Sequence, residues 1–103
     1  MSVIVEFSMF PTDKGDSVSP YVSRIIKMMI ESGIAYKLTP MGTVFEVSEM
    51  HDALTVVGKA YRQLEMDCGR VFAIAKFDIR KGKENRMDDK IRSIEDKIGN
   101  VSK

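Results

Sequence analysis

The feature that most constrains the fold is a three-residue turn near the middle of the chain, Pro40-Met41-Gly42. It lies between two short strand candidates, residues 35–39 and 43–47. A connection of this length that contains proline and glycine has the turn chemistry of a β-hairpin, so the two segments are expected to pair antiparallel. The second segment carries one acid, Glu46, among apolar residues. A glutamate that cannot face a core has to face something else.

A strand and a helix are predicted on the N-terminal side of this hairpin. Residues 3–10 alternate between two faces with period two and are rich in β-branched and aromatic side chains, which is typical of a strand. Ser19 and Pro20 then supply an N-cap and a first-turn proline, so the helix starts near Pro20, or a turn earlier if Ser17 is the cap. The apolar residues that follow recur at three-and-four spacing up to Gly33, which predicts a helix that ends at this glycine.

A second helix, a strand and a third helix are predicted on the C-terminal side. Ser48 is the candidate N-cap of the second helix, and Cys68-Gly69 ends it. Residues 71–79 form the last strand candidate. A basic turn follows at residues 80–83, and we expect this turn and Arg86 to be exposed. The final helix has an apolar stripe with near-heptad spacing, formed by Met87, Ile91, Ile94, Ile98 and Val101.

The predicted order is strand, helix, strand, strand, helix, strand and helix. The first six elements form the split βαβ pattern of an α+β ferredoxin-like sandwich, βαββαβ, to which the chain adds a C-terminal helix. We expect a single domain over residues 1–103, with the first two helices on one face of a four-stranded sheet. In the usual spatial order of the strands, four, one, three, two, the first strand is central. Glu6 and Glu46 then lie on adjacent strands and face the uncovered side of the sheet.

The uncovered side of the predicted sheet is partly apolar. Its apolar residues are Ile4, Phe10, Val44, Phe72 and Ile74. An apolar surface of this extent is seldom left in water, so we expect a second copy of the chain to cover it. On the same side, Glu6 is expected either to pair with Lys76 across the strands or to remain free for a ligand.

Composition argues against several classes of protein. The 16 basic and 15 acidic residues leave a net charge of +1, which gives no general attraction to nucleic acid or to an anionic membrane. The single cysteine, Cys68, rules out an internal disulfide, and no run approaches the ~20 apolar residues of a membrane span. Because the N-terminus also lacks a signal-like apolar segment, we expect a cytoplasmic protein. With one histidine, neither a metal centre nor a bound cofactor is expected.

Several motifs of the chain resemble those of the thiamine-binding-like proteins, small ferredoxin-like chains that assemble into dimers and tetramers. The motifs cover nearly the whole chain and are Phe10-Pro11, residues 17–22, Ser32-Gly33, residues 36–43, Glu46 and Arg70-Val71. The most specific of them is the hairpin turn followed by Glu46. The resemblance implies binding of thiamine, or of its hydroxymethylpyrimidine half, without known catalytic chemistry. One departure is Val47, where the family often has glycine, and this change would narrow or reshape the adjacent pocket.

The implied ligand suits the residues of the predicted site. An aminopyrimidine is a flat ring with an amine donor and ring-nitrogen acceptors, and the thiazolium half of thiamine is a cation that acids and ring faces would attract. We predict that Glu46 is the principal polar contact, with Ser8 and Thr43 next, although hydroxyl residues also occur in strands and turns for backbone reasons. Aromatic side chains would stack on the ring. The predicted site residues are Glu46, Thr43, Ser8, Glu6, Phe10 and Tyr36.

The sequence leaves more than one function open. The first is a non-catalytic carrier or sensor of a thiamine-type metabolite, and the alternative is a structural or regulatory homo-oligomerisation module without a ligand. An RNA-binding sheet has a similar topology, but the last strand lacks the aromatic signature used for base stacking. No nucleophile-base pair or metal spacing supports an enzyme. We therefore expect self-association to a dimer or tetramer, no catalysis, and no nucleic-acid or membrane partner.

Overall fold

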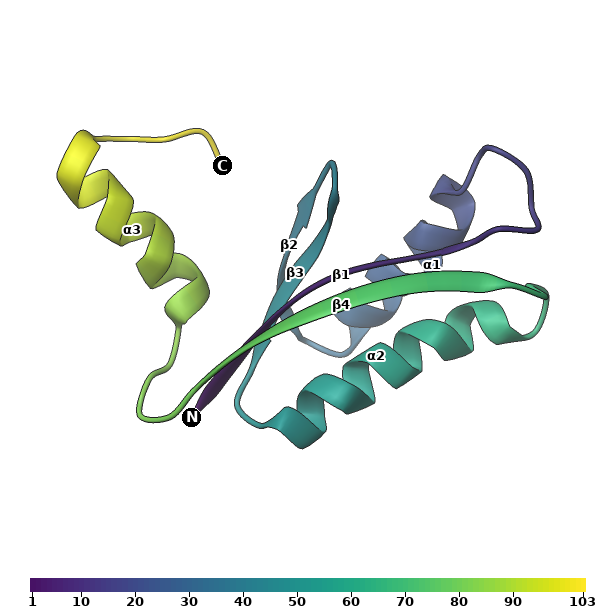
Figure 1. Ribbon diagram of the computed structural model, residues 1–103, viewed down its shortest axis with the longest axis horizontal. Helices are drawn as coiled ribbons and strands as arrows, with labels where there is room; N and C mark the ends of the chain where they lie inside the picture. Colours follow the sequence, from purple (N-terminus) through teal and green to yellow (C-terminus); the bar gives the residue numbers. More distant parts are fainter.

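The computed structural model describes all 103 residues and contains four strands and three helices in the predicted order (Figure 1). The elements are β1 (Ser2–Pro11), α1 (Ser19–Glu31), β2 (Ala35–Thr39), β3 (Gly42–Val47), α2 (Met50–Glu65), β4 (Val71–Arg80) and α3 (Arg86–Ile98). None of the three helices has the length and apolar character that crossing a membrane requires.

The four strands form one antiparallel sheet in the predicted order, β2-β3-β1-β4. β1 is central because it pairs with β3 from Val3 to Phe7 and with β4 along its whole length. α1 and α2 lie side by side on one face of this sheet (Figure 1). The α+β ferredoxin-like sandwich with an added C-terminal helix is therefore confirmed.

The hydrophobic core lies between the sheet and these two helices. β1 alternates as predicted, so that Val3, Val5 and Phe7 are buried under the helices while Glu6 is exposed on the other side. Phe45 of β3 packs edge-on against Phe7, with ring centroids 5.7 Å apart. The helices contribute Ile25, Met28, Met29, Ala53, Val56, Ala60 and Leu64. Each large side chain removed from water in this way contributes about 1.5–3 kcal/mol, and this burial holds the two layers together.

The starts of the first two helices differ slightly from the prediction. α1 begins at Ser19, so Val18 rather than Ser19 occupies the capping position. α2 begins at Met50, and its capping position is held by Glu49, which has extended backbone and forms no side-chain cap bond. The predicted Ser48 cap is wrong. The helix begins one residue later than predicted, so Glu49 occupies the N-cap position and Ser48 precedes it.

α3 stands apart from this two-layer body, on the face of the sheet that α1 and α2 leave uncovered (Figure 1). Its side chains and backbone contact Lys37, Glu46 and Asp78, whose positions in the strand register share that face. The first turn of α3 is attached to the sheet, and the rest of the helix projects away from it.

Candidate functional site

A cavity of about 300 Å³ lies at the hairpin end of the sheet, where β1 runs on past β3. The last pair between these two strands is Phe7 with Thr43, and β1 then continues to Pro11 with only β4 beside it. The resulting notch is bordered by the β2–β3 turn and by α1, and we call it the hairpin cavity. Its lining residues are Phe7, Ser8, Met9, Phe10, Val22, Ile25, Leu38, Thr39, Pro40, Met41, Gly42 and Thr43, none of which is charged.

Two hydroxyl groups that were predicted to contact a ligand line the hairpin cavity. Ser8 Oγ donates a hydrogen bond to the backbone oxygen of Met41 at 2.9 Å, so its proton is used and its lone pairs remain free to accept. Thr43 is only 5% exposed, and its hydroxyl has no partner within the chain. Because no fully buried side-chain oxygen or nitrogen lacks a partner, the Thr43 hydroxyl is not sealed from solvent, and Thr43 is one of the residues that line the cavity. Thr43 is opposite Phe7 in the register and so lies on the helix-covered face, whereas Ser8 lies on the uncovered face. The acceptor and the free hydroxyl therefore border the cavity from opposite sides of the sheet.

Gly42 and Phe10 shape the hairpin cavity. A Cβ atom at position 42 would lie 2.9 Å from both the Phe7 backbone oxygen and Ser8 Oγ, so only glycine allows the turn to approach β1 so closely. Phe10 packs against Phe72 on β4, with ring centroids 5.8 Å apart and ring planes at 45°. Phe10, supported by this neighbour, gives the cavity a rigid apolar wall.

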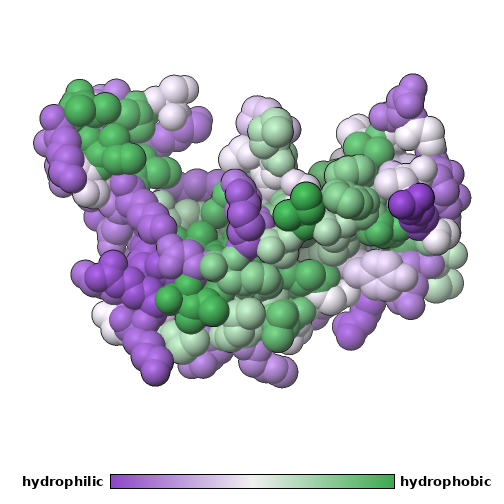
Figure 2. All heavy atoms as spheres, viewed as in Figure 1, coloured by the Kyte–Doolittle hydropathy of each residue, from purple (hydrophilic) through white to green (hydrophobic).

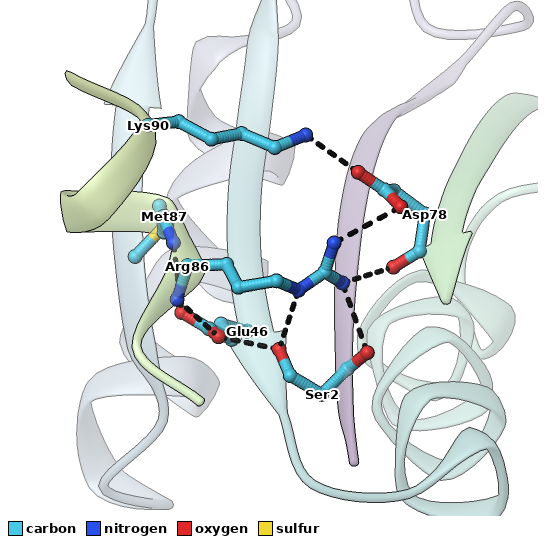
Figure 3. A network of polar contacts seen from close by, with 6 residues as sticks. All are labelled: Ser2, Glu46, Asp78, Arg86, Met87 and Lys90. Carbon is cyan, nitrogen blue, oxygen red and sulfur yellow. Dashed lines mark hydrogen bonds and ion pairs between the residues drawn. The ribbon is translucent and has the colours of Figure 1, made fainter. Parts of the chain in front are cut away.

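Glu46 lies at the other end of β3 and outside the hairpin cavity. Its carboxylate accepts hydrogen bonds from the backbone N–H groups of Arg86 and Met87, at 2.8 and 3.1 Å, and from the Ser2 hydroxyl (Figure 3). It therefore caps the first turn of α3, where unpaired N–H groups and the helix dipole favour an anion. These donors all belong to the chain itself.

Arg86 is the second part of this attachment and is buried, with 4% of its surface exposed. Its guanidinium donates to the backbone oxygens of Ser2 and Asp78, at 2.9 and 2.6 Å, and to Ser2 Oγ at 3.2 Å. It also forms an ion pair of 3.0 Å with the Asp78 carboxylate, which Lys90 pairs with as well (Figure 3). We call Ser2, Glu46, Asp78, Arg86 and Lys90 the clasp, because they join β1, β3 and β4 to α3.

The clasp holds its carboxylates in the charged form. Burial opposes the charge of Glu46, but hydrogen bonds from Ser2, Met87 and Arg86 outweigh this effect, so the pKa of Glu46 lies below its usual value. The pKa of Asp78 is also lowered, by its bonds to Lys90 and Arg86. A carboxylate whose charge is compensated within the chain offers little to a ligand unless these donors withdraw.

Two other predicted site residues also lie apart from the hairpin cavity. Glu6 faces the uncovered side of the sheet and pairs with Lys76 at 2.9 Å, so the cross-strand ion pair is the alternative that the structure contains. Tyr36 is opposite Phe45 in the register, which places it on the core face, away from the side of Glu46. Its side chain packs against the core instead of lining the cavity.

Of the six predicted site residues, the structure thus brings Ser8, Phe10 and Thr43 together. Glu6 and Glu46 do share the uncovered face, as the strand order predicts. Glu46 is opposite Ile4, and Ile4 and Glu6 lie on the same side of β1. They do not meet at one pocket. A role for either acid in contacting a ligand stays a prediction.

The clasp contains residues that the sequence analysis did not identify as functional. The expectation that Arg86 is exposed with the basic turn is wrong, because its flat guanidinium finds backbone oxygens at the ends of β1 and β4. One feature of the strand register points to this ion pair. Asp78 and Glu46 both lie opposite Ile4, one on each neighbouring strand. Two acids that flank the same residue on an uncovered face call for a cation nearby.

Comparison with known proteins gives a family and several relatives. The family model described as thiamine-binding protein matches residues 5–95 of the chain. A UPF0045 protein of Methanocaldococcus jannaschii is 34% identical over 92 residues, which cover 89% of this chain and 91% of that protein. A UPF0045 protein of Mycobacterium bovis is 32% identical over 95 residues, which cover 92% of this chain and 93% of that protein.

Two solved structures have the same fold. The crystal structure of a hypothetical protein from Methanocaldococcus jannaschii has a TM-score of 0.80 at 33% identity and covers 90% of this chain and 95% of its own. A Thermotoga maritima protein, provisionally assigned to thiamine biosynthesis or salvage, has a TM-score of 0.77 and covers 91% of this chain and 99% of its own. At 20% identity, this second likeness establishes the fold alone.

Proposed function

The chain belongs to the thiamine-binding protein family, and from this premise we propose that it binds thiamine, or the hydroxymethylpyrimidine half of thiamine, without catalysing a reaction. The family description and the provisional assignment of the Thermotoga maritima protein support a thiamine-related role. The hairpin cavity offers hydroxyl groups and apolar walls, with no ionisable side chain to act as acid or base. This chemistry supports binding rather than catalysis. The protein would then act as a cytoplasmic carrier or sensor.

The observation that carries the proposal is the pair of hydroxyl groups in the hairpin cavity. The exocyclic amine of an aminopyrimidine donates to the free lone pairs of Ser8 Oγ, whose own proton is held by the Met41 carbonyl. The Thr43 hydroxyl, which has no partner in the chain, donates to a ring nitrogen. The flat ring packs between apolar side chains beside Phe10. The cavity therefore offers the ring one acceptor and one donor, which border it from opposite sides of the sheet.

The absence of charge among the lining residues supports a particular orientation of the ligand. A thiazolium cation would lose its hydration in the hairpin cavity without gaining an anionic partner. The neutral pyrimidine half enters the cavity in this proposal, and the thiazolium half stays towards solvent at its mouth. Glu6 and Glu46 lie outside the cavity, so an additional contact with either acid would be made by the exposed part of the ligand.

Calorimetric titration with thiamine and with hydroxymethylpyrimidine tests the proposal. Thr43→Val keeps the shape of the side chain and removes its hydroxyl, and we expect roughly a tenfold loss of affinity for both compounds, as for one hydrogen bond. Glu46→Gln serves as the comparison and is expected to change the affinity little. Unchanged affinity in Thr43→Val together with a large loss in Glu46→Gln would move the ligand from the hairpin cavity to the clasp.

A homo-oligomerisation module remains the second candidate function, because the uncovered face carries exposed apolar side chains. Phe72 and Ile74 on β4 are 47% and 54% exposed. A patch of this kind favours self-association to a dimer or tetramer, with or without a ligand. Native mass spectrometry of the purified protein separates the two functions, since it reports the number of subunits and any small molecule that they retain.

A further inference from the structure

α3 is attached to the sheet by polar groups that are concentrated at its first turn. Glu46 accepts from the backbone of the first two residues, and the Arg86 side chain reaches Ser2 and Asp78. Further contacts come from Lys90, which pairs with Asp78, and from Asp88, whose ion pair with Lys37 of β2 spans 2.6 Å. Each of these contacts includes a carboxylate or the Arg86 guanidinium.

Little apolar surface of α3 is buried against the sheet. The predicted stripe of the helix is only partly covered. Met87, Ile91 and Val101 are half-buried, and Ile94 and Ile98 are 51% and 73% exposed. Figure 2 shows the same division, with hydrophilic residues gathered around the foot of α3 and hydrophobic ones on the helix above. The docked position of α3 therefore depends on the charged contacts at its foot rather than on hydrophobic burial.

The groups that face Glu46 make it the acceptor on which the attachment of the α3 backbone depends. From β1 it faces the Ser2 hydroxyl, and from α3 the two backbone N–H groups and the Arg86 guanidinium. Asp78 of β4 and Lys90 of α3 are linked to it through Arg86. Glu84, in the loop before α3, and Met1, which carries the positive α-amino group, line the same small hollow. Loss of the Glu46 charge leaves two helix N–H groups without an anionic acceptor.

We propose that α3 is a strap that releases from the sheet as a unit when Glu46 loses its charge, while the two-layer domain stays folded. The core side chains under α1 and α2 make no use of the clasp, since they lie on the opposite face of the sheet. Released and docked forms therefore differ in the position of residues 81–103 and share one core. The strap is a device of this fold whether or not a ligand occupies the hairpin cavity.

The direction of the pH dependence follows from the groups of the clasp. The pKa of Glu46 is lowered in the docked form, so its contribution is present above its free value, about 4.3, and is lost as the pH falls through the docked value. The pKa values of Asp78 and Asp88 are lowered too, by their bonds to Lys90 and Lys37 first, and they act in the same direction. Acid therefore favours release, and neutral pH favours docking.

Release would change what the Glu46 carboxylate contacts. In the docked form its oxygens accept from the chain's own donors, so an amine from outside has no open position. In the released form the carboxylate is free to accept from such a donor. Docking of α3 and contact of Glu46 with an external amine thus exclude each other. Only this contact with an amine rests on the proposed function, whereas release of α3 does not.

Hydrogen-deuterium exchange at neutral pH on the full-length protein tests the strap. Glu46→Gln keeps the size of the side chain and removes the charge, and we expect amide exchange in residues 86–98 to become roughly tenfold faster, as for a lost charge-assisted hydrogen bond. Protection in β1 and α2 should stay within about twofold of the wild type. Glu65→Gln, at the exposed end of α2, is the matched control and should leave both regions unchanged.

A second variant guards against an effect specific to glutamine. Arg86→Lys keeps the positive charge but cannot reach the Ser2 and Asp78 oxygens as a planar fork, so it should also speed exchange in α3 selectively. The strap is supported if both variants lose protection in residues 86–98 alone. It is overturned if α3 exchanges at the wild-type rate in both, or if β1 and α2 lose protection to the same extent as α3.

Discussion

The two ends of the sheet use polar groups in opposite ways. At the clasp end, the Glu46 carboxylate and the Arg86 guanidinium are engaged by the chain's own donors and acceptors. At the hairpin end, Ser8 and Thr43 border an uncharged cavity of about 300 Å³, and the Thr43 hydroxyl has no partner. One end is a completed attachment, and the other is an incomplete polar site.

If the ligand binds in the hairpin cavity as proposed, charge is a poor guide to the ligand site in this chain. Glu46 attracts attention in the sequence because an acid in an apolar strand needs a partner, and the structure supplies that partner as the first turn of α3. The Thr43 hydroxyl attracts less attention in the sequence, but it has no partner in the chain and lines an uncharged cavity. Four substitutions test this comparison, in order of expected effect.

Arg86→Met tests the clasp end with the largest expected effect. Methionine fills part of the space but leaves the backbone oxygens of Ser2 and Asp78 without a donor, so docking of α3 should weaken by about 2–3 kcal/mol. Limited proteolysis with trypsin measures this, because the exposed lysines of residues 81–97 are cleaved readily only when the segment leaves the sheet and can enter the protease. The affinity for hydroxymethylpyrimidine should not change. Slow cleavage equal to that of the wild type would mean that other contacts hold α3.

Gly42→Ala tests the hairpin end. The added Cβ meets the Phe7 backbone oxygen at 2.9 Å, and backbone cannot move aside as a side chain does, so the protein should lose about 1–3 kcal/mol in stability and bind the ligand more weakly. Gly58→Ala is the matched control, since nothing lies near its Cβ position and alanine favours helix by up to about 1 kcal/mol. Chemical denaturation and calorimetry measure both. Equal midpoints and affinities for the two variants would contradict the close packing of the turn on β1.

Ser8→Ala is expected to cost about 1 kcal/mol in stability and several-fold in ligand affinity, because it removes the bond to the Met41 carbonyl and the acceptor for the ligand amine. Ser23→Ala is a suitable control. It removes a similar bond to the Ser19 carbonyl, on an exposed part of α1, and should leave the affinity unchanged. If the two variants bind equally well, Ser8 is a residue of the turn alone.

Glu6→Gln, between the two ends, should have the smallest effect. Its ion pair with Lys76 joins side chains that are 48% and 74% exposed, so its loss should cost less than about 1 kcal/mol and less still at high salt. Thermal unfolding at low and high salt measures this contribution. A several-fold loss of ligand affinity, in contrast, would give Glu6 the contact role that its position on the uncovered face first suggested.

Much of the fold follows from local patterns in the sequence. The turn at residues 40–42, the two-residue period of β1 and the helical spacing before Gly33 are all local, and together they leave the split βαβ order as the solution. Placing Glu6 and Glu46 on one face needs only that order and the alternation of side chains along a strand. These predictions are confirmed because they depend on neighbours in the chain.

The hairpin cavity and the clasp could not be predicted from local patterns, because both depend on contacts between segments that are distant in the sequence. The hairpin cavity exists because β1 extends four residues beyond its last pair with β3, and this overhang is a matter of register between distant segments. Burial of Arg86 depends on where a helix of residues 86–98 settles on a sheet end formed by residues 2 and 78. Tyr36 carries the family resemblance, yet the register turns it to the core face.

The most direct test of the account is an NMR titration of the labelled protein with hydroxymethylpyrimidine. If the free groups at the hairpin end form the site, the largest amide shifts will occur at Ser8, Gly42 and Thr43, and the amides of Arg86 and Met87 will not move. If the largest shifts instead appear at Ser2, Glu46 and Met87, the ligand binds at the clasp and the account is wrong.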